Sequence, residues 1–131
     1  MQGNDSTHPS GKKRILVADD EPSVREFLLR ALAHTGFDVN AVADGNAALA
    51  ALDRAPYDMI LTDIVMPDMD GVALALKVAK DFPAMKIILM SGYADQRERV
   101  HNLDQLAHAV VSKPFTLEEI TRRVTSAAQQ G

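Results

Sequence analysis

Short apolar segments alternate with longer amphipathic segments along most of the chain. The apolar segments are too short for helices and rich in β-branched residues, which is typical of strands buried on both faces of a sheet. The pattern therefore predicts five such strands, at residues 15–18, 39–42, 59–61, 87–90 and 109–111.

The amphipathic segments between these strands have helical spacing. In residues 22–34, apolar side chains recur every three or four positions, and Gly36 follows as a C-terminal cap. The pattern predicts four further helices, which begin at Asp44, Asp70, Asp95 and Thr116; Thr116 and Glu119 have the spacing of a capping box. Strand and helix alternate five times, which predicts an α/β fold with a doubly wound, five-stranded parallel sheet and helices on both faces.

Composition narrows the class of protein. With 131 residues, of which 47% are hydrophobic and 24% charged, the chain is expected to form one folded domain. No apolar run approaches the roughly 20 residues of a membrane span, so we expect no membrane association. The absence of cysteine excludes disulfides and thiolate sites, and the net charge of -4 argues against nucleic-acid binding.

The chain ends are expected to lie outside the folded domain. Residues 1–12 carry no apolar stretch after Met1, so they predict a disordered tail and not a secretory signal. We expect the domain over 13–128, a short tail over 129–131, and a cytoplasmic protein.

Polar residues follow four of the predicted strands. Asp19 and Asp20 follow the first, Asp63 the third, and Ser91 the fourth, while Lys113 comes just after the fifth. In an open α/β sheet, ligands bind at this carboxyl edge. Clustered carboxylates repel one another and need a counter-charge, and Mg²⁺ is typically held by one or two carboxylates plus phosphate oxygens.

The same residues suggest phosphoryl chemistry. Lys113 and Ser91 could bind phosphoryl oxygens, and a carboxylate could act as the nucleophile that forms an aspartyl phosphate. Taken singly, the residues have simpler explanations: Asp19 and Asp20 could cap the following helix, and Asp63 could be a turn residue. Their conjunction at one sheet edge favours a phosphoryl site.

Residues 68–71 and the histidines do not indicate a further chemical site. Residues 68–71 resemble the start of a calcium loop, but Ala79 stands where the bidentate Glu belongs, so calcium is excluded. The histidines, among them His34 and His108, are scattered, and we expect surface or helix-end roles for them.

Four strings of the sequence resemble the receiver domain of two-component response regulators. They are ILVADDE, YDMILTDIVMPDMDG, IILMSGY and VVSKPF, in this order and spacing. The resemblance spans about residues 13–128 and implies a flavodoxin-like, CheY-like fold with strand order 2-1-3-4-5. The chain is similar both to receivers of hybrid histidine kinases and to stand-alone receivers of CpdR type.

The resemblance also implies roles for individual residues. Asp63 would accept a phosphoryl group from a histidine kinase or a histidine phosphotransfer protein. Asp19, Asp20, Asp63 and the Val65 main-chain carbonyl would hold Mg²⁺, for which Mn²⁺ could substitute. Ser91 would be the switch hydroxyl, and Lys113 would bind the phosphoryl group.

The chain departs from the family pattern at the usual switch aromatic, which is Val110 here. Tyr93 is expected to report the switch instead, and Tyr93, Val110 and Phe115 to belong to the partner surface. Val65 and Tyr93 hold the family positions that flank the path of the hydrolytic water.

The expected function is therefore that of a single-domain response regulator, which is not an enzyme beyond its own phosphorylation and dephosphorylation. Its output would be a change in affinity for a protein target. Three alternatives compete with this function: a small phosphatase with an aspartate nucleophile, a flavin carrier on the same fold, and a receiver-like domain that binds a partner without phosphate. A phosphatase would need an Asp where Val65 stands, a flavin carrier would need an anion loop in place of Asp19 and Asp20, and the complete acidic set argues against the third.

Overall fold

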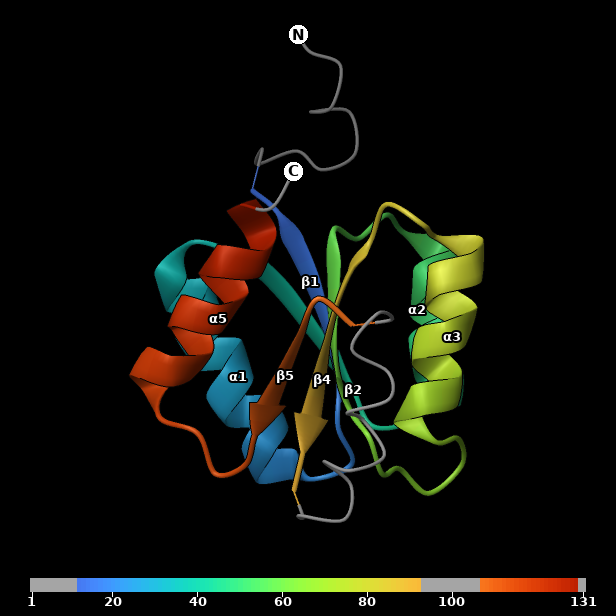
Figure 1. Ribbon diagram of the computed structural model, residues 1–131, viewed down its shortest axis with the longest axis horizontal. Helices are drawn as coiled ribbons and strands as arrows, with labels where there is room; N and C mark the ends of the chain where they lie inside the picture. Colours follow the sequence, from blue (N-terminus) through green and yellow to red (C-terminus); the bar gives the residue numbers. More distant parts are fainter. Residues whose placement is uncertain (1–11, 93–106, 130–131) are drawn as a thin grey trace, which may run out of the picture.

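The computed structural model describes residues 12–92 and 107–129 as a single α/β layer structure (Figure 1). Its elements are β1 (Arg14–Ala18), α1 (Pro22–Thr35), β2 (Asp38–Val42), α2 (Gly45–Arg54), β3 (Met59–Asp63), α3 (Gly71–Asp81), β4 (Lys86–Ser91), β5 (Ala109–Ser112) and α5 (Leu117–Gln129). The five strands are parallel and ordered β2-β1-β3-β4-β5. The predicted doubly wound sheet and its order are confirmed.

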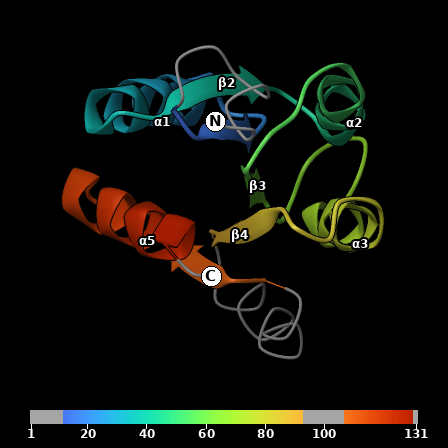
Figure 2. The same cartoon turned by 90° about the horizontal axis from the view of Figure 1, so that it is seen from above.

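Helices cover both faces of the sheet and create two cores. Figure 2 shows α1 and α5 on one face and α2 and α3 on the other. Because side chains alternate along a strand, Leu16 of β1 packs in the core with α2 and α3, whereas Ile15 and Val17 pack in the core with α1 and α5. This alternation explains why the central strands are apolar at nearly every position.

The edge strands differ from the prediction of burial on both faces. The three inner strands are almost wholly buried, but β2 has no fully buried residue and β5 has one, Val111. An edge strand has a neighbouring strand on one side only, so its flank stays open to solvent. The expectation is therefore correct for β1, β3 and β4 and wrong for β2 and β5.

The predicted helix ends are confirmed. Gly36 ends α1 with a left-handed φ of 109°, a conformation that favours glycine. Asp44 caps α2 by accepting the Ala47 N–H at 2.7 Å, and Asp70 caps α3 by accepting the Val72 N–H at 2.6 Å. The Thr116 and Glu119 side chains each accept the other residue's N–H, which is the predicted capping box before α5.

Some predictions fall outside the described residues: nearly all of the tail over 1–12, the helix from Asp95, and residues 130–131. Helix α5 runs to Gln129, one residue beyond the expected end of the domain. Among the described helices, none has the length and apolar character needed to cross a membrane.

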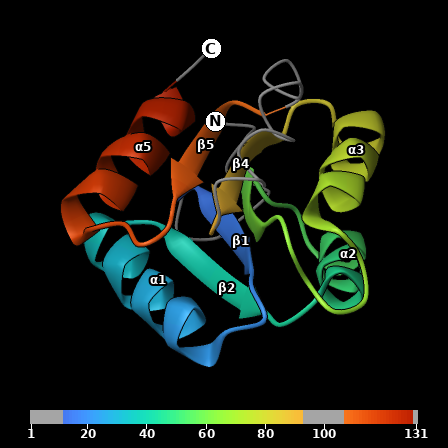
Figure 3. The same ribbon diagram turned by 60° about the horizontal axis from the view of Figure 1, so that its bottom comes forward.

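The parallel arrangement places the carboxyl ends of all strands at one edge, which comes forward in Figure 3. Ala18 pairs with Thr62, and Asp63 with Met90, so the residues that follow β1 lie beside the end of β3. At the next strand pair, Ser91 lies opposite Ser112. The strand registers therefore bring the ends of β1, β3, β4 and β5 to one place.

Candidate functional site

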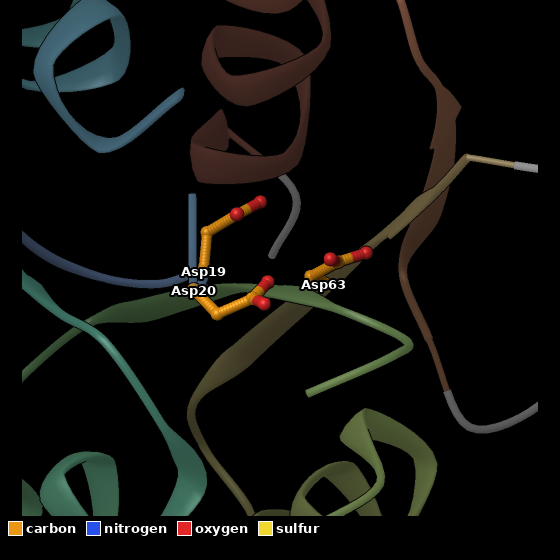
Figure 4. A group of neighbouring side chains, drawn as sticks. All are labelled: Asp19, Asp20 and Asp63. Atoms are coloured by element: carbon orange, nitrogen blue, oxygen red, sulfur yellow. The ribbon is translucent and has the colours of Figure 1, made fainter. Parts of the chain in front are cut away.

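Three carboxylates from two strands meet at this edge. Asp19 and Asp20 follow β1 directly, and Asp63 is the last residue of β3. One carboxylate oxygen of each lies within 4.8 Å of the others, and Figure 4 shows the three side chains as neighbours at the ends of their strands. Asp19 is fully buried and Asp63 is 7% exposed, whereas Asp20 is open to solvent.

Local hydrogen bonds fix the turn that carries Asp19. Its Oδ1 accepts the Glu21 N–H at 2.9 Å, and the Arg25 guanidinium of α1 donates to its main-chain oxygen at 2.8 Å. The N-cap of α1 is Glu21, with no side-chain cap bond. The simpler explanation that Asp19 and Asp20 cap this helix is therefore wrong.

Lys113 reaches into the acidic group from the end of β5. Its Nζ lies 2.8 Å from Asp19 Oδ2, 3.3 Å from Asp63 Oδ2 and 3.3 Å from Glu21 Oε1. The Lys113 N–H donates to the Ser91 carbonyl at 2.8 Å, which ties the lysine to the end of β4. One ammonium group thus faces three carboxylates, and with Asp20 nearby the site keeps an excess of negative charge.

The surroundings shift the pKa values of both central groups. Burial raises the pKa of Asp63, and the Asp19 carboxylate adds to this effect, although Lys113 opposes it. Burial alone would lower the pKa of Lys113, but Asp19, Asp63 and Glu21 together outweigh burial and raise it. Lys113 therefore stays an ammonium in the site.

The donor set fits a hard divalent cation. The three carboxylates offer only oxygen atoms as ligands and carry more negative charge than Lys113 neutralises. Mg²⁺ prefers oxygen ligands of this kind. Asp19, Asp20 and Asp63 would hold the ion together with the main chain of Val65, which comes two residues after Asp63 and whose N–H acts to lower the pKa of the Asp63 carboxyl.

A cavity of about 630 Å³ opens over the acids. Its polar lining includes Asp20, Asp63 and Lys113. Its apolar lining comprises Val24, Phe27, Val65, Pro114 and Phe115. The rings of Phe27 and Phe115 lie with centroids 6.1 Å apart. The Asp63 carboxylate can therefore be reached from solvent by a phosphoryl group.

The structure also places the remaining predicted residues. Ser91 is buried at the end of β4, and Val110 is half-buried in β5, packed against the core under α2 and α3. Phe115 is half-buried against the core under α1 and α5. Tyr93 lies outside the described residues.

Three residues of the site and its surroundings were missed by sequence reasoning. Glu21 and Arg25 bind Lys113 and the Asp19 main chain through contacts that no local pattern reveals. The sequence pattern suggests for Asp68 only a calcium loop, yet its carboxylate accepts hydrogen bonds from the first turn of α2. In the sequence, the role of Asp68 is indicated only by the presence of an acidic residue in the loop that follows Asp63.

The fold is a doubly wound α/β domain with three carboxylates and Lys113 at the carboxyl edge of its sheet, and comparison with known proteins gives its family. Residues 15–125 match the family described as the response regulator receiver domain, so the chain belongs to that family. It is thus a receiver domain of two-component signalling with a CheY-like fold, a class whose members accept a phosphoryl group on an aspartate.

Individual relatives agree with this assignment. The response regulator receiver protein CpdR of Brucella abortus is 36% identical over 112 residues, which cover 86% of this chain and 93% of CpdR. The chain spans about half the length or less of the transcriptional regulators that it also matches.

Two solved structures are similar in fold and sequence. One is the response regulator TrrA of Thermotoga maritima in complex with Mg²⁺ and BeF, with a TM-score of 0.80, 33% identity, and coverage of 88% of this chain and 98% of that one. The other is a CheY-like receiver domain protein of Methanospirillum hungatei, with a TM-score of 0.83, 30% identity, and coverage of 90% and 94%.

Proposed function

We propose that Asp63 of this receiver domain accepts a phosphoryl group from a phosphohistidine protein in a Mg²⁺-dependent reaction. The observation that carries this proposal is the joint presence of Lys113 and three carboxylates on one reachable, largely buried site. The donor would be a histidine kinase or a histidine phosphotransfer protein. The domain would catalyse only its own phosphorylation and dephosphorylation.

Each side chain has a defined task in this reaction. An Asp63 oxygen bonds to phosphorus while the bond from phosphorus to the histidine nitrogen breaks, and the imidazole leaves with that electron pair. Lys113 balances charge on the phosphoryl oxygens, and Ser91 supplies a hydroxyl to them. Mg²⁺, or Mn²⁺ in its place, would neutralise negative charge of the phosphoryl group and the acids.

The alternatives fit the site less well. A phosphatase of the aspartate-nucleophile kind needs a second acid at the position of Val65, whose side chain cannot transfer a proton. A flavin phosphate would meet the carboxylates of Asp19 and Asp20. A receiver-like domain without phosphate would have no need of three carboxylates gathered beside one open cavity.

Intact-mass analysis with a small acyl phosphate and Mg²⁺ tests the proposal. The expected result is one added phosphoryl group in the wild type and none in Asp63→Asn, with Mn²⁺ supporting the same adduct. No adduct in the wild type, or undiminished labelling of the variant, would contradict it.

The output is proposed to be a change in affinity for a protein target. Ser91 ends β4 and Lys113 directly follows β5, where the chain continues toward α5, and Phe115 comes two residues after Lys113. We expect chemical-shift changes with a phosphoryl mimic to concentrate between Ser91 and Phe115, including Tyr93 and Val110. Changes confined to α1 and α2 would count against this surface.

A further inference from the structure

Asp68 joins the loop after β3 to the first turn of a different helix. Its Oδ1 accepts the Gly45 N–H at 3.0 Å, and its Oδ2 accepts the Asn46 N–H at 2.8 Å. These amides are the first two of α2 and lie more than twenty residues earlier in the chain. Hydrogen bonds from Asn46 and then Gly45 lower the pKa of the Asp68 carboxyl, so the group is ionised at neutral pH.

This bridge lies in the middle of the loop that leaves Asp63. The start of the loop is fixed, because the Ile64 N–H donates to the Met90 carbonyl at 3.0 Å and the Ile64 carbonyl accepts the Gly71 N–H at 2.7 Å. Past Ile64, several contacts hold the loop, and Met69 packs against the core under α2 and α3 and against Gly45. Met66 is buried in the core under α2 and α3, and Asp68 is bound to α2.

Capping alone does not explain Asp68. Helix α2 already has an N-cap, Asp44, which accepts the Ala47 N–H at 2.7 Å from the chain directly before the helix. Asp68 satisfies the two remaining first-turn amides from another segment. It therefore connects two parts of the molecule, whereas Asp44 serves only its own helix.

We propose that Asp68 is a positioning residue for the divalent-cation site: by fastening the loop to α2, it holds the main chain of Val65 beside Asp63. The inference rests on the proposed function, in which Val65 contributes to the cation site. Asp68 would act through Met66 and Pro67, the two residues that separate it from Val65, and not by contact with the cation or the phosphoryl group.

Linkage gives this idea a second observable consequence. If the contact between Asp68 and α2 raises the affinity for Mg²⁺, then Mg²⁺ must strengthen that contact by the same factor. Amide hydrogen exchange at Gly45 and Asn46 should then slow on Mg²⁺ addition by more than at Ala47, whose N–H is bound by Asp44. The effect needs no phosphorylation and can be read in the wild-type chain.

The test compares Mg²⁺ dissociation constants of the full chain, measured by NMR titration, for the wild type and three variants. In Asp68→Ala the constant should rise by about fivefold or more, the size of a typical coupling between sites. Asp68→Asn keeps an oxygen acceptor and should fall in between. Asp44→Ala is the matched control: it also removes a cap of α2, and its constant should stay close to that of the wild type.

The possible results distinguish failure of the positioning role of Asp68 from failure of the proposed function. Equal Mg²⁺ constants in Asp68→Ala and Asp44→Ala would show that Asp68 has only a capping role and would overturn the positioning proposal alone. Absence of Mg²⁺ binding in the wild type would overturn the proposed function and this inference with it. If Asp68→Ala fails to fold, the wild-type exchange experiment decides, and equal slowing at Gly45, Asn46 and Ala47 would refute the proposal.

Discussion

Gly71 lies directly against the main chain of Asp63. A β carbon at position 71 would overlap the Asp63 carbonyl oxygen and come within 2.9 Å of the Ile64 Cα. The Gly71 N–H also donates to the Ile64 carbonyl, so the first turn of α3 rests on the end of β3. Glycine is required here by close approach and not by an unusual φ, because Gly36 is the positive-φ glycine of the described chain.

Gly71→Ala should therefore disturb both folding and the acceptor site. We expect the free energy of unfolding to fall by about 1–3 kcal/mol, as for other overpacked sites, and phosphorylation of Asp63 to slow. Denaturant unfolding and intact-mass labelling measure the two effects. Gly36→Ala is the control, because its cost of about 1 kcal/mol comes from backbone strain away from the site. Equal labelling rates in both variants would contradict the prediction.

The sequence predicts the elements of this protein better than the contacts between them. Apolar runs and caps such as Asp44 act locally, so strands and helix ends could be located from them. The strand order came from the family resemblance. The exposure of β2 and the binding of Asp68 to α2 depend on packing between distant segments, which no local pattern contains. Within the site, Asp63 and Lys113 were predicted, but Glu21 was not.

Asp63→Asn should leave the fold intact or more stable at neutral pH. Burial and the neighbouring Asp19 raise the pKa of Asp63 despite Lys113, so the folded state disfavours the ionised carboxylate. That destabilisation sets in as the pH rises above the usual value of 3.8 and is complete above the raised folded-state pKa. The variant should melt at or above the wild-type temperature at pH 7, and the difference should shrink toward pH 4. A lower melting temperature than the wild type at pH 7 would contradict this account.

Mg²⁺ should stabilise the folded chain. A ligand that binds only the folded state raises stability by mass action, and at one hundred times its dissociation constant the gain is about 2.7 kcal/mol. Thermal unfolding with and without millimolar Mg²⁺ at neutral pH measures it. The exposed Asp20 carboxylate belongs to the acidic group, so the gain should vanish in Asp20→Ala. An equal gain in that variant would place the cation elsewhere.

His108 should make stability depend on pH. The expectation of a surface or helix-end role was incomplete. The ring Nδ1 of His108 accepts the Ile87 N–H at 2.9 Å, and the main-chain N–H of His108 donates to the Ile87 carbonyl. Partial burial and the Lys86 ammonium lower the pKa of His108 below 6.5. Its contribution is therefore present above about pH 6.5 and is lost as the pH falls below that value, since protonated Nδ1 cannot accept a hydrogen bond.

Melting temperatures between pH 7.5 and 5.5 check this dependence. His108→Gln should flatten the decline on the acid side, and His34→Gln, near the end of α1, should retain it. Identical profiles for the wild type and His108→Gln would show that another group controls stability in this range.

Val65 should prolong the life of the aspartyl phosphate. The residue is 49% exposed and lines the cavity that also reaches Asp63, where a hydrolytic water would approach. Hydrolysis needs a water aligned with the phosphorus, and valine has no polar group to orient one. Val65→Asn should therefore speed the loss of phosphate by about fivefold, which corresponds to one hydrogen bond of about 1 kcal/mol.

The decay of phosphorylated protein in excess Mg²⁺ measures that rate. Val65→Ala is the control for size, because it opens the same space without adding a polar group, and its decay should stay near the wild-type rate. Tyr93→Glu, at the other expected flank of the water path, should add to the effect of Val65→Asn. If the wild type decays as fast as the double variant, these two side chains do not control access of water, and phosphate persistence must have another cause.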